Sequence, residues 1–330
     1  MGCRSSAFGH IREIVPPMPE VSIVIVNMNC PDILIPCLDS IKAYTKVSYE
    51  TLVVAYMYTT ENLLRLKEQY PWVTIVESNE LRGFSENNNL ALRQARGKYC
   101  FVVNDDTWME MPVIDTLVSD FEKLPDNLAA VSPKIVFPNG KVQTCGRAPW
   151  TAWRYMLHYL HMVDETHPSK WSMKEGLFQT WTLNGACFMA KTTAFRAVGW
   201  FDERYTFTPE DIALGHIFNE KGYTVYADSD VAIIHLANAT ASHIELAIKP
   251  TRVCGALLFY CGENCFLHNL LASYVWLVEE VRIIKYSVIG HKSGRNKLMY
   301  DIAQNVQWAV WSGKEPKEIF VELYSRVRSL

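Results

Sequence analysis

Short apolar runs alternate with longer segments of helical spacing over the first 135 residues. Three runs are apolar at nearly every position, which is typical of strands buried on both faces of a sheet: VSIVIV (residues 21–26), TLVVA (51–55) and YCFVV (99–103). Shorter runs predict strands at 73–76 and 129–133, and the intervening periodicity predicts helices at 33–44, 61–70, 85–96 and 111–124. The alternation predicts an α/β fold with a mostly parallel central sheet flanked by helices.

The rest of the chain changes character twice. Residues 136–176 follow no regular period, and the pattern after them predicts a strand at 180–190, a helix at 209–221 and two short strands at 224–227 and 231–235. From residue 257 the spacing is helical to the end. We therefore divide the chain into a tail (1–20), an α/β domain with two halves (21–245, divided at about 135) and a C-terminal helical region (246–330).

Composition excludes several classes of protein. With 32 Lys and Arg against 35 Asp and Glu, the net charge of −3 does not predict a nucleic-acid-binding face. The 10 Trp residues suit either a flat ligand such as a sugar or base, or simply a large core. The nine cysteines are scattered without a CxxC pair, which favours free thiols in a reducing, cytoplasmic compartment.

Neither end of the chain predicts a membrane span. Residues 1–19 lack the apolar core of a secretory signal, although the opening MGCRSS fits either N-myristoylation with palmitoylation at Cys3 or a chance match. The apolar stretch 267–289 contains four charged residues, which argue against insertion. The C-terminal helices either form an amphipathic membrane surface or pack against the catalytic domain or a subunit partner; their apolar faces carry Trp276, Trp308 and Trp311.

Acidic residues follow the fourth predicted strand directly. In parallel sheets a ligand lies beyond the carboxyl ends of the strands, and Asn104, Asp105 and Asp106 occupy such a position. Two carboxylates there can hold a divalent cation that in turn binds a diphosphate. The alternative is that Asp106 only caps the following helix.

Three further segments carry candidate chemistry. A helix begins within RGFSENNN (residues 82–89), where an anion or a simple turn would each fit. Glu210 and Asp211 open another helix, as a general base or as a complement to the helix dipole. His235 ends a strand, as a structural residue or as a further metal ligand that would suit Mn²⁺ better than Ca²⁺.

Taken in order, these segments resemble family 2 glycosyltransferases of the GT-A fold. The resemblance covers about residues 21–236 and rests on VSIVIVNMN, RGFSENNNLALRQARGKYCFVVNDDT, WTLNGACFMAKTTAFRAVGWFDERYTFTPEDIALGHIFNEKGY and VAIIHL. GFSENNN and the NDD variant of the acidic motif indicate the bacterial rhamnosyltransferase-like branch in particular.

The resemblance implies a reaction as well as a fold. It implies inverting transfer of a sugar, rhamnose among the candidates, from a dTDP- or UDP-sugar to a glycan or lipid-linked acceptor in polysaccharide biosynthesis, with Mn²⁺ or Mg²⁺. Residues 21–135 would bind the nucleotide and residues 136–245 the acceptor. Asp106 and His235 would hold the metal, and Asp211, with Glu210 second, would be the base. The implied donor-binding residues are Asn27, Asn29, Tyr56, Arg82, Gly83, Asn88, Asp105, Trp181, Asn184 and Gly185.

Two positions depart from the family pattern. Ala55 stands where members usually carry an Asp that reads the base, so recognition would shift to stacking on Tyr56 or Tyr58 or to groups near Asn27 and Asn29. Ala213 replaces the second acid of the Glu-Asp-x-Asp pattern. These losses keep open a second hypothesis, a non-catalytic sugar-nucleotide-binding or scaffold protein of the same fold. Separately, a homo-oligomer is among the expected partners.

Overall fold

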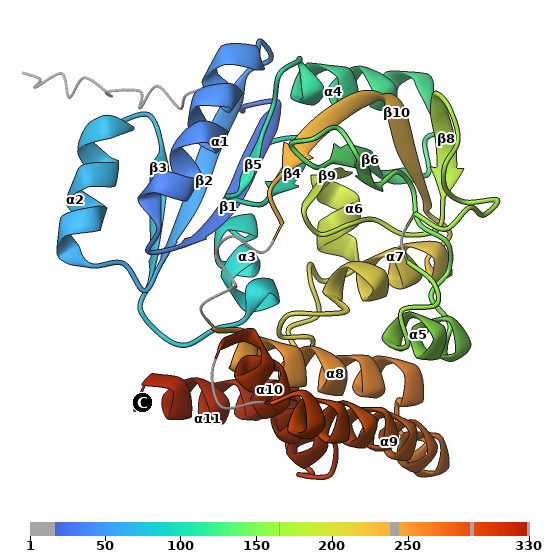
Figure 1. Ribbon diagram of the computed structural model, residues 1–330. Coiled ribbons are helices and arrows are strands. Elements are labelled where there is room, and N and C mark those ends of the chain that lie inside the picture. Colours follow the sequence, from blue (N-terminus) through green and yellow to red (C-terminus); the bar gives the residue numbers. More distant parts are fainter. Residues whose placement is uncertain (1–16, 165, 238–243, 291–293, 329–330) are drawn as a thin grey trace, which may run out of the picture.

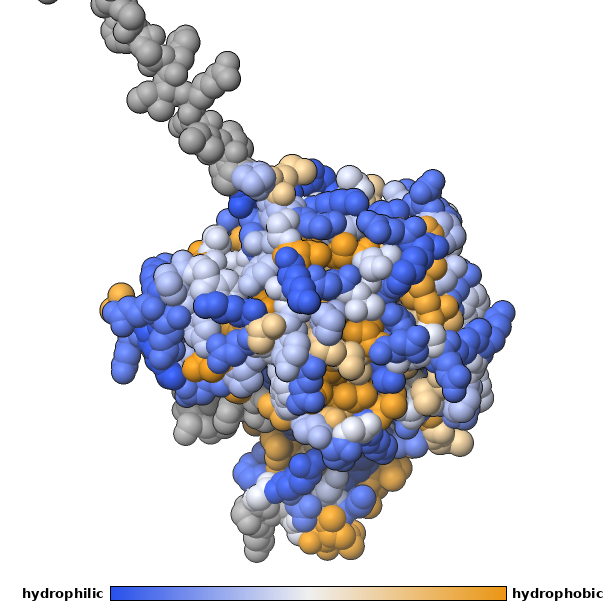
Figure 2. All heavy atoms as spheres, turned by 90° about the horizontal axis from the view of Figure 1, so that it is seen from above, coloured by the Kyte–Doolittle hydropathy of each residue, from blue (hydrophilic) through white to orange (hydrophobic). Residues whose placement is uncertain are grey.

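The computed structural model describes residues 17–164, 166–237, 244–290 and 294–328, so the N-terminal motif with Cys3 lies outside the described residues. A ten-stranded sheet forms the α/β body, and four C-terminal helices form a layer beside it (Figure 1). The part of the surface seen in Figure 2 is mostly hydrophilic, with apolar side chains gathered in a few places.

The first half of the sheet is parallel, as the apolar runs predict. Its strands lie in the order β3-β2-β1-β4, and they are β1 (Val21–Met28), β2 (Tyr49–Tyr56), β3 (Thr74–Ser78) and β4 (Tyr99–Val103). Every residue of β4 is buried, which explains why its sequence shows no alternation of polar and apolar positions. The parallel register brings the carboxyl ends of β1, β2 and β4 to one edge.

The second half of the sheet is mixed. Strand β9 (Cys187–Lys191) runs antiparallel between β4 and β6 (Leu128–Val136), and β10 (Thr224–His235) lies parallel to β6. Three short strands complete it, all antiparallel to their neighbours: β5 (Thr107–Trp108), β7 (Val142–Thr144) and β8 (Leu177–Thr180).

Helices cover both faces of the sheet. Ile23 and Ile25 point to one face, where they pack with apolar residues of α1 (Pro31–Tyr44) and α4 (Val113–Lys123). Val24 points to the other, against α3 (Phe84–Leu92), α6 (Thr192–Ala197) and α7 (Glu210–Glu220). The alternation follows from the two-residue period of a strand. Helix α2 (Thr60–Gln69) adds Leu66 to the first core.

The C-terminal helices have a core of their own. They are α8 (Glu245–Cys261), α9 (Cys265–Ile289), α10 (Gly294–Val310) and α11 (Pro316–Arg328). Trp276 and Trp308 pack against this core, as does α5 (Ala152–Tyr159), whereas Trp311 is half exposed. Packing therefore accounts for two of the three predicted boundary tryptophans. Within the described ranges, no helix is long and apolar enough to cross a membrane.

Three predictions about local structure were wrong. Residues 180–190 form parts of two strands, β8 and β9, separated by a loop at 181–186. Residues 224–235 form one strand with a shift in register after Asp228, not two strands. The irregular segment 136–176 contains β7 and α5. In each case the sequence pattern did not show where the chain turns, because the turns depend on contacts with distant residues.

Candidate active site

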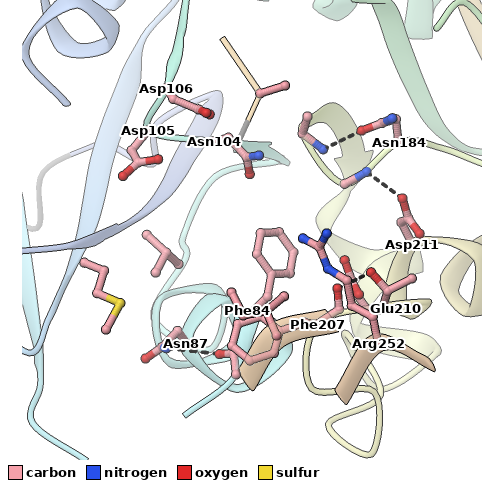
Figure 3. A pocket seen from close by; sticks show the side chains of 18 of the residues that line it. Phe84, Asn87, Asn104, Asp105, Asp106, Asn184, Phe207, Glu210, Asp211 and Arg252 are labelled. Atoms are coloured by element: carbon pink, nitrogen blue, oxygen red, sulfur yellow. Dashed lines mark hydrogen bonds between the residues drawn. The ribbon is translucent and has the colours of Figure 1, made fainter. Parts of the chain in front are cut away.

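The carboxyl ends of β1, β2 and β4 open into a cavity of about 410 Å³. Helices α3, α7 and α8 contribute the other walls. Figure 3 shows Asp105 and Asp106 on one side of this cavity and Glu210 and Asp211 on the other. Two acidic pairs that lie more than 100 positions apart in the sequence thus face one space, at the edge where parallel sheets bind ligands.

Asp105 is held by a buried asparagine of the first strand. Nδ2 of Asn27 donates to Oδ2 of Asp105 at 2.6 Å, while Oδ1 of Asn27 accepts from the backbone N–H of Cys30 and from the Tyr58 hydroxyl. Asn27 is fully buried and does not line the cavity. Its observed contacts orient Asp105.

Asp106 lies beside His235, the last residue of β10. Oδ1 of Asp106 is 3.1 Å from Nε2 of His235. Gln143 fixes the ring, since its Nε2 donates to the His235 carbonyl at 2.6 Å and its Oε1 lies 2.9 Å from Nδ1. The amide oxygen can only accept, so Nδ1 carries the proton of this contact and Nε2 is the ring nitrogen that faces Asp106.

This pair fits the predicted divalent cation. A carboxylate oxygen and an imidazole nitrogen 3.1 Å apart are held together either by a proton between them or by a cation that both bind. The two are ligand types that Mn²⁺ accepts, and Gln143 is the outer hydrogen-bond partner that metal-bound histidines usually have. No three Asp, Glu, His or Cys side chains of the described residues are grouped as a metal site. Asp106 and His235 would hold such a cation.

Asp211 is fixed on the opposite wall by three donors. Its Oδ2 accepts from Arg147 at 2.6 Å and from the backbone N–H of Gly185 at 2.9 Å, and its Oδ1 accepts from the backbone N–H of Ile212. Arg147 also donates to the carbonyl of Leu183. A Cβ added to Gly185 would lie 3.3 Å from Oε1 of Glu210, so glycine lets the loop approach both acids.

Glu210 has fewer hydrogen bonds than the neighbouring Asp211. It is buried, and its Oε2 has no hydrogen-bond partner among the described residues. Burial and the negative charge of Asp211 raise the pKa of Glu210 to about 8, although the positive charges of Arg252 and Arg147 oppose the rise. The carboxyl is thus poised to gain or lose a proton near neutral pH.

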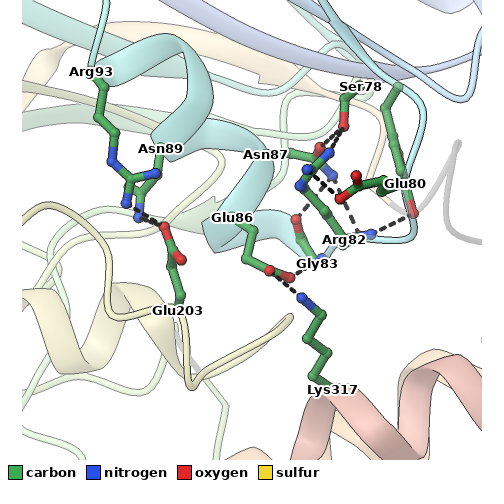
Figure 4. Close-up of polar contacts among 11 residues, drawn as sticks. Ser78, Glu80, Arg82, Gly83, Glu86, Asn87, Asn89, Arg93, Glu203 and Lys317 are labelled. Carbon is green, nitrogen blue, oxygen red and sulfur yellow. Dashed lines mark hydrogen bonds and ion pairs between the residues drawn. The ribbon is translucent and has the colours of Figure 1, made fainter.

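The start of α3 forms the third wall, through Arg82 and Gly83. Nη1 of Arg82 donates to Ser78 and Nη2 to Glu80, and Glu86 accepts from the backbone N–H of Gly83 (Figure 4). A Cβ at Gly83 would lie 2.2 Å from the carbonyl oxygen of Thr206, so only glycine fits. Lys317 of α11 binds Glu86, which connects the C-terminal helices to this wall.

The predicted donor-binding residues divide into two groups. Those that line the cavity are Tyr56, Arg82, Gly83, Asp105, Asn184 and Gly185. Four others do not line it: Asn27, Asn29, Asn88 and Trp181. Asn29 binds Thr59 and Asn62, Asn88 binds the Phe84 carbonyl, and the Trp181 ring packs edge-on against Trp171.

Sequence reasoning missed several residues of the site. Gln143, Arg147 and Arg252 were not expected, and Asn87 lines the cavity in place of the neighbouring Asn88. Asn87 could have been found from the helical period of α3, which turns it, and not Asn88, toward the strand ends. The other three lie in segments without a recognisable motif, so their role depends on tertiary contacts alone.

A second cavity, of about 380 Å³, lies between α5, α7, α8, α9 and α10. Arg147, Thr208 and Arg252 line both cavities, so the two adjoin at the Glu210–Asp211 wall. Three polar atoms of its lining are shielded from solvent without a partner among the described residues: Oη of Tyr155, Oη of Tyr260 and Nε of Arg252. Burial raises the pKa of both tyrosines, so both hydroxyls remain donors.

Comparison with known proteins identifies the family of this chain. The profile described as glycosyl transferase family 2 matches residues 22–191, just over half of the chain. The O-antigen biosynthesis protein RfbC of Myxococcus xanthus is 28% identical over 70% of this chain and 18% of its own length. The N-acetylglucosaminyl-diphospho-decaprenol L-rhamnosyltransferase of Mycobacterium tuberculosis is 26% identical over 47% of this chain and 54% of its own.

Solved structures agree on the fold. Mannosyltransferase PcManGT from Pyrobaculum calidifontis, in complex with GDP-Man and Mn²⁺, superposes with a TM-score of 0.50 at 16% identity, over 95% of this chain and 81% of that one. GalNAc-T7 with UDP, GalNAc and Mn²⁺ gives 0.55 at 13% identity, over 95% and 58%. The predicted GT-A fold and the similarity to rhamnosyltransferases are confirmed. The chain belongs to glycosyl transferase family 2.

Proposed function

We propose that the chain transfers a sugar from a nucleoside-diphosphate donor to a hydroxyl of a glycan or lipid-linked acceptor, with inversion. The observation that carries this proposal is the placement of two acidic pairs on opposite walls of one cavity. In a single displacement the leaving diphosphate needs positive charge on one side of the sugar, and the acceptor needs a base on the other.

The donor would lie against the wall formed by β1, β4 and α3. Asp106 and His235 would hold Mn²⁺ or Mg²⁺, which when bound neutralises charge on the leaving diphosphate. Asp105, fixed by Asn27, and Arg82, fixed by Ser78 and Glu80, would position the nucleotide. Tyr56 offers a ring for the base, since Ala55 carries no acceptor.

Asp211 would remove the acceptor proton, and Glu210 is the second candidate. Three hydrogen bonds hold Asp211 in place, as a base that acts on a positioned hydroxyl requires. The pH profile separates the two. If Glu210 were the base, kcat/KM would rise with pH through about 8, because the carboxyl must lose its proton to act. If Asp211 is the base, E210Q retains activity and D211N does not.

The second cavity would receive the acceptor. It adjoins the Glu210–Asp211 wall, and its unpartnered donors on Tyr155, Tyr260 and Arg252 call for oxygen acceptors. Its lining has four basic side chains, Arg147, Lys249, Arg252 and Arg282, and three of them pair with Asp211, Glu245 and Glu279. An acceptor with phosphoryl oxygens, such as a diphospholipid-linked sugar, satisfies both features. The acceptor in the mycobacterial relative's name would fit this pattern, and that name is also our reason to propose rhamnose as the sugar.

Titration with a panel of dTDP-, UDP- and GDP-sugars tests the proposal. The experiment measures binding heat and released nucleotide with Mn²⁺ and then with EDTA. We expect one donor to bind only with metal and to be hydrolysed slowly in the absence of acceptor. If no donor binds in a metal-dependent way, the transferase proposal is wrong.

The replacements at Ala55 and Ala213 support one alternative, a member of the fold that binds a sugar nucleotide without transferring it. This alternative predicts binding without nucleotide release for every donor and acceptor tried. Restoring A55D would then strengthen donor binding, whereas in an active transferase it would alter the choice of base.

A further inference from the structure

One helix of the C-terminal layer exposes an apolar stripe that only one serine, Ser273, interrupts. Six large apolar side chains of α9 are between 54% and 80% exposed: Phe266, Leu270, Leu277, Val281, Ile284 and Val288. Leu271, Ala272, Val275 and Glu279 of the same helix are buried on its other side. The helix therefore has an apolar inner face that the protein covers and an apolar outer face that the described residues leave open.

The spacing of the stripe keeps it straight. Together with the exposed Ser273, its positions are separated by 4, 3, 4, 4, 3 and 4 residues, an 11-residue repeat present twice. Such a repeat corresponds to about 3.67 residues per turn, close to the 3.6 of a straight helix. The stripe thus runs along one side of α9 for about 33 Å, at a rise of about 1.5 Å per residue. A straight, long apolar stripe fits a flat surface.

Positive charge gathers at one end of the stripe. Residues 281–300 contain no Asp or Glu and five basic residues: Arg282, Lys285, Lys292, Arg295 and Lys297. Arg282 pairs with Glu279 on the inner side of the helix and Lys297 pairs with Asp301, so the exposed basic cluster outside these ion pairs consists of Lys285 and Arg295. Lys292 lies outside the described residues. An apolar helix face next to a basic cluster matches a bilayer with anionic headgroups.

A second copy of the chain matches less well. Parallel pairing of two α9 helices would place basic segment against basic segment. Antiparallel pairing about Leu277 would place residues 281–289 against residues 265–273, which contain no acid. Neither arrangement supplies negative charge to the cluster. Figure 1 also shows α9 on the side of the helical layer away from the sheet, where a surface can reach it.

We propose that α9 docks the protein on a membrane surface that contains anionic lipid, with the stripe in the interface and the basic cluster at the headgroups. Glu279 and Arg282 on its inner side line the second cavity, so docking would bring that cavity to the bilayer. The proposal does not depend on the transfer reaction, because it rests on the outer face alone.

Co-sedimentation of the purified chain with vesicles tests it. Vesicles of phosphatidylcholine, with or without phosphatidylglycerol, are compared at low and high salt. We expect binding to the anionic vesicles to be weakened by salt, and the double variant L277E/V281E to lose at least about tenfold in affinity, since it places charge in the apolar interface. K285E/R295E should lose the preference for anionic lipid.

The matched control is L64E, because Leu64 on α2 is 53% exposed and lies on another helix. It should bind vesicles as the wild type does. Unchanged melting temperature in all variants separates docking from folding. The proposal is overturned if the wild type does not bind anionic vesicles, or if L277E/V281E binds as tightly as L64E. It is equally overturned if sedimentation shows a dimer that L277E/V281E dissociates.

Discussion

Replacement of Glu210 by glutamine should stabilise the protein increasingly as the pH rises. Glu210 is buried, and its pKa is raised from 4.5 to about 8 by desolvation and by the charge of Asp211. Between these values the folded protein keeps a proton that the unfolded chain has lost. Folding then binds a proton, so the stability of the wild type falls with increasing pH. The glutamine side chain does not ionise, so the stability of the variant does not fall in this way.

The raised pKa sets the size of the effect. Each unit of pKa difference corresponds to about 1.36 kcal/mol, so a rise of about 3.5 units gives an upper limit of about 5 kcal/mol. The effect is absent below pH 4.5, grows across the interval and levels off above about pH 8. The positive charges of Arg252 and Arg147 already lower this pKa, so their effect is contained in the limit, and we expect a stabilisation of about 5 kcal/mol at most.

Denaturant unfolding of wild type and E210Q at pH 5.5, 7 and 8.5 measures the effect. The expected result is a difference in unfolding free energy that favours E210Q and increases from the lowest to the highest pH. The matched control is E220Q on the same helix, because Glu220 is exposed and paired only with His216. A difference in unfolding free energy that does not change with pH would show that Glu210 is ionised throughout this range. The raised pKa of Glu210 would then be wrong.

Three further predictions concern the cavity. D106A and H235A should each abolish metal-dependent donor binding, which calorimetry measures. If either variant still binds the donor in a metal-dependent way, the cation site at Asp106 and His235 is wrong. D211N should lower transfer by at least about a hundredfold while donor binding persists, as expected for loss of a general base; undiminished turnover would contradict the assignment. G83A should destabilise the protein by about 1–3 kcal/mol, because the added Cβ would lie 2.2 Å from the Thr206 oxygen, and an unchanged melting curve would refute the close approach.

The parallel half of the fold could be predicted because its central strands are buried on both faces. Strands such as β1 and β4 are covered on both faces, so their sequences are almost wholly apolar and are recognisable without neighbours. Asp105 and Asp106 could be singled out because they follow such a strand, and Glu210 and Asp211 because they open a predicted helix. The position of the cavity at the strand ends follows from the parallel order of the sheet.

The antiparallel strands and the inner partners of the site could not be predicted. Strand β9 lies between β4 and β6, which come earlier in the chain, so its pairing is decided by the packing of the whole sheet. Gln143 and Arg147 reach His235 and Asp211 across 92 and 64 positions of sequence. Neither residue carries a local signal, because a single side-chain contact leaves no periodic trace in the sequence.

The sequence by itself determined the elements and the chemical groups of this protein: buried parallel strands, helices between them and acidic residues at their ends. Only the tertiary structure decided which groups meet. It directed Nε2 of His235 toward Asp106, left Oε2 of Glu210 without a partner among the described residues beside a well-bonded Asp211, and turned one face of α9 outward. The physical reason is that periodicity records burial along one element, whereas orientation, desolvation and charge pairing depend on residues far apart in the chain.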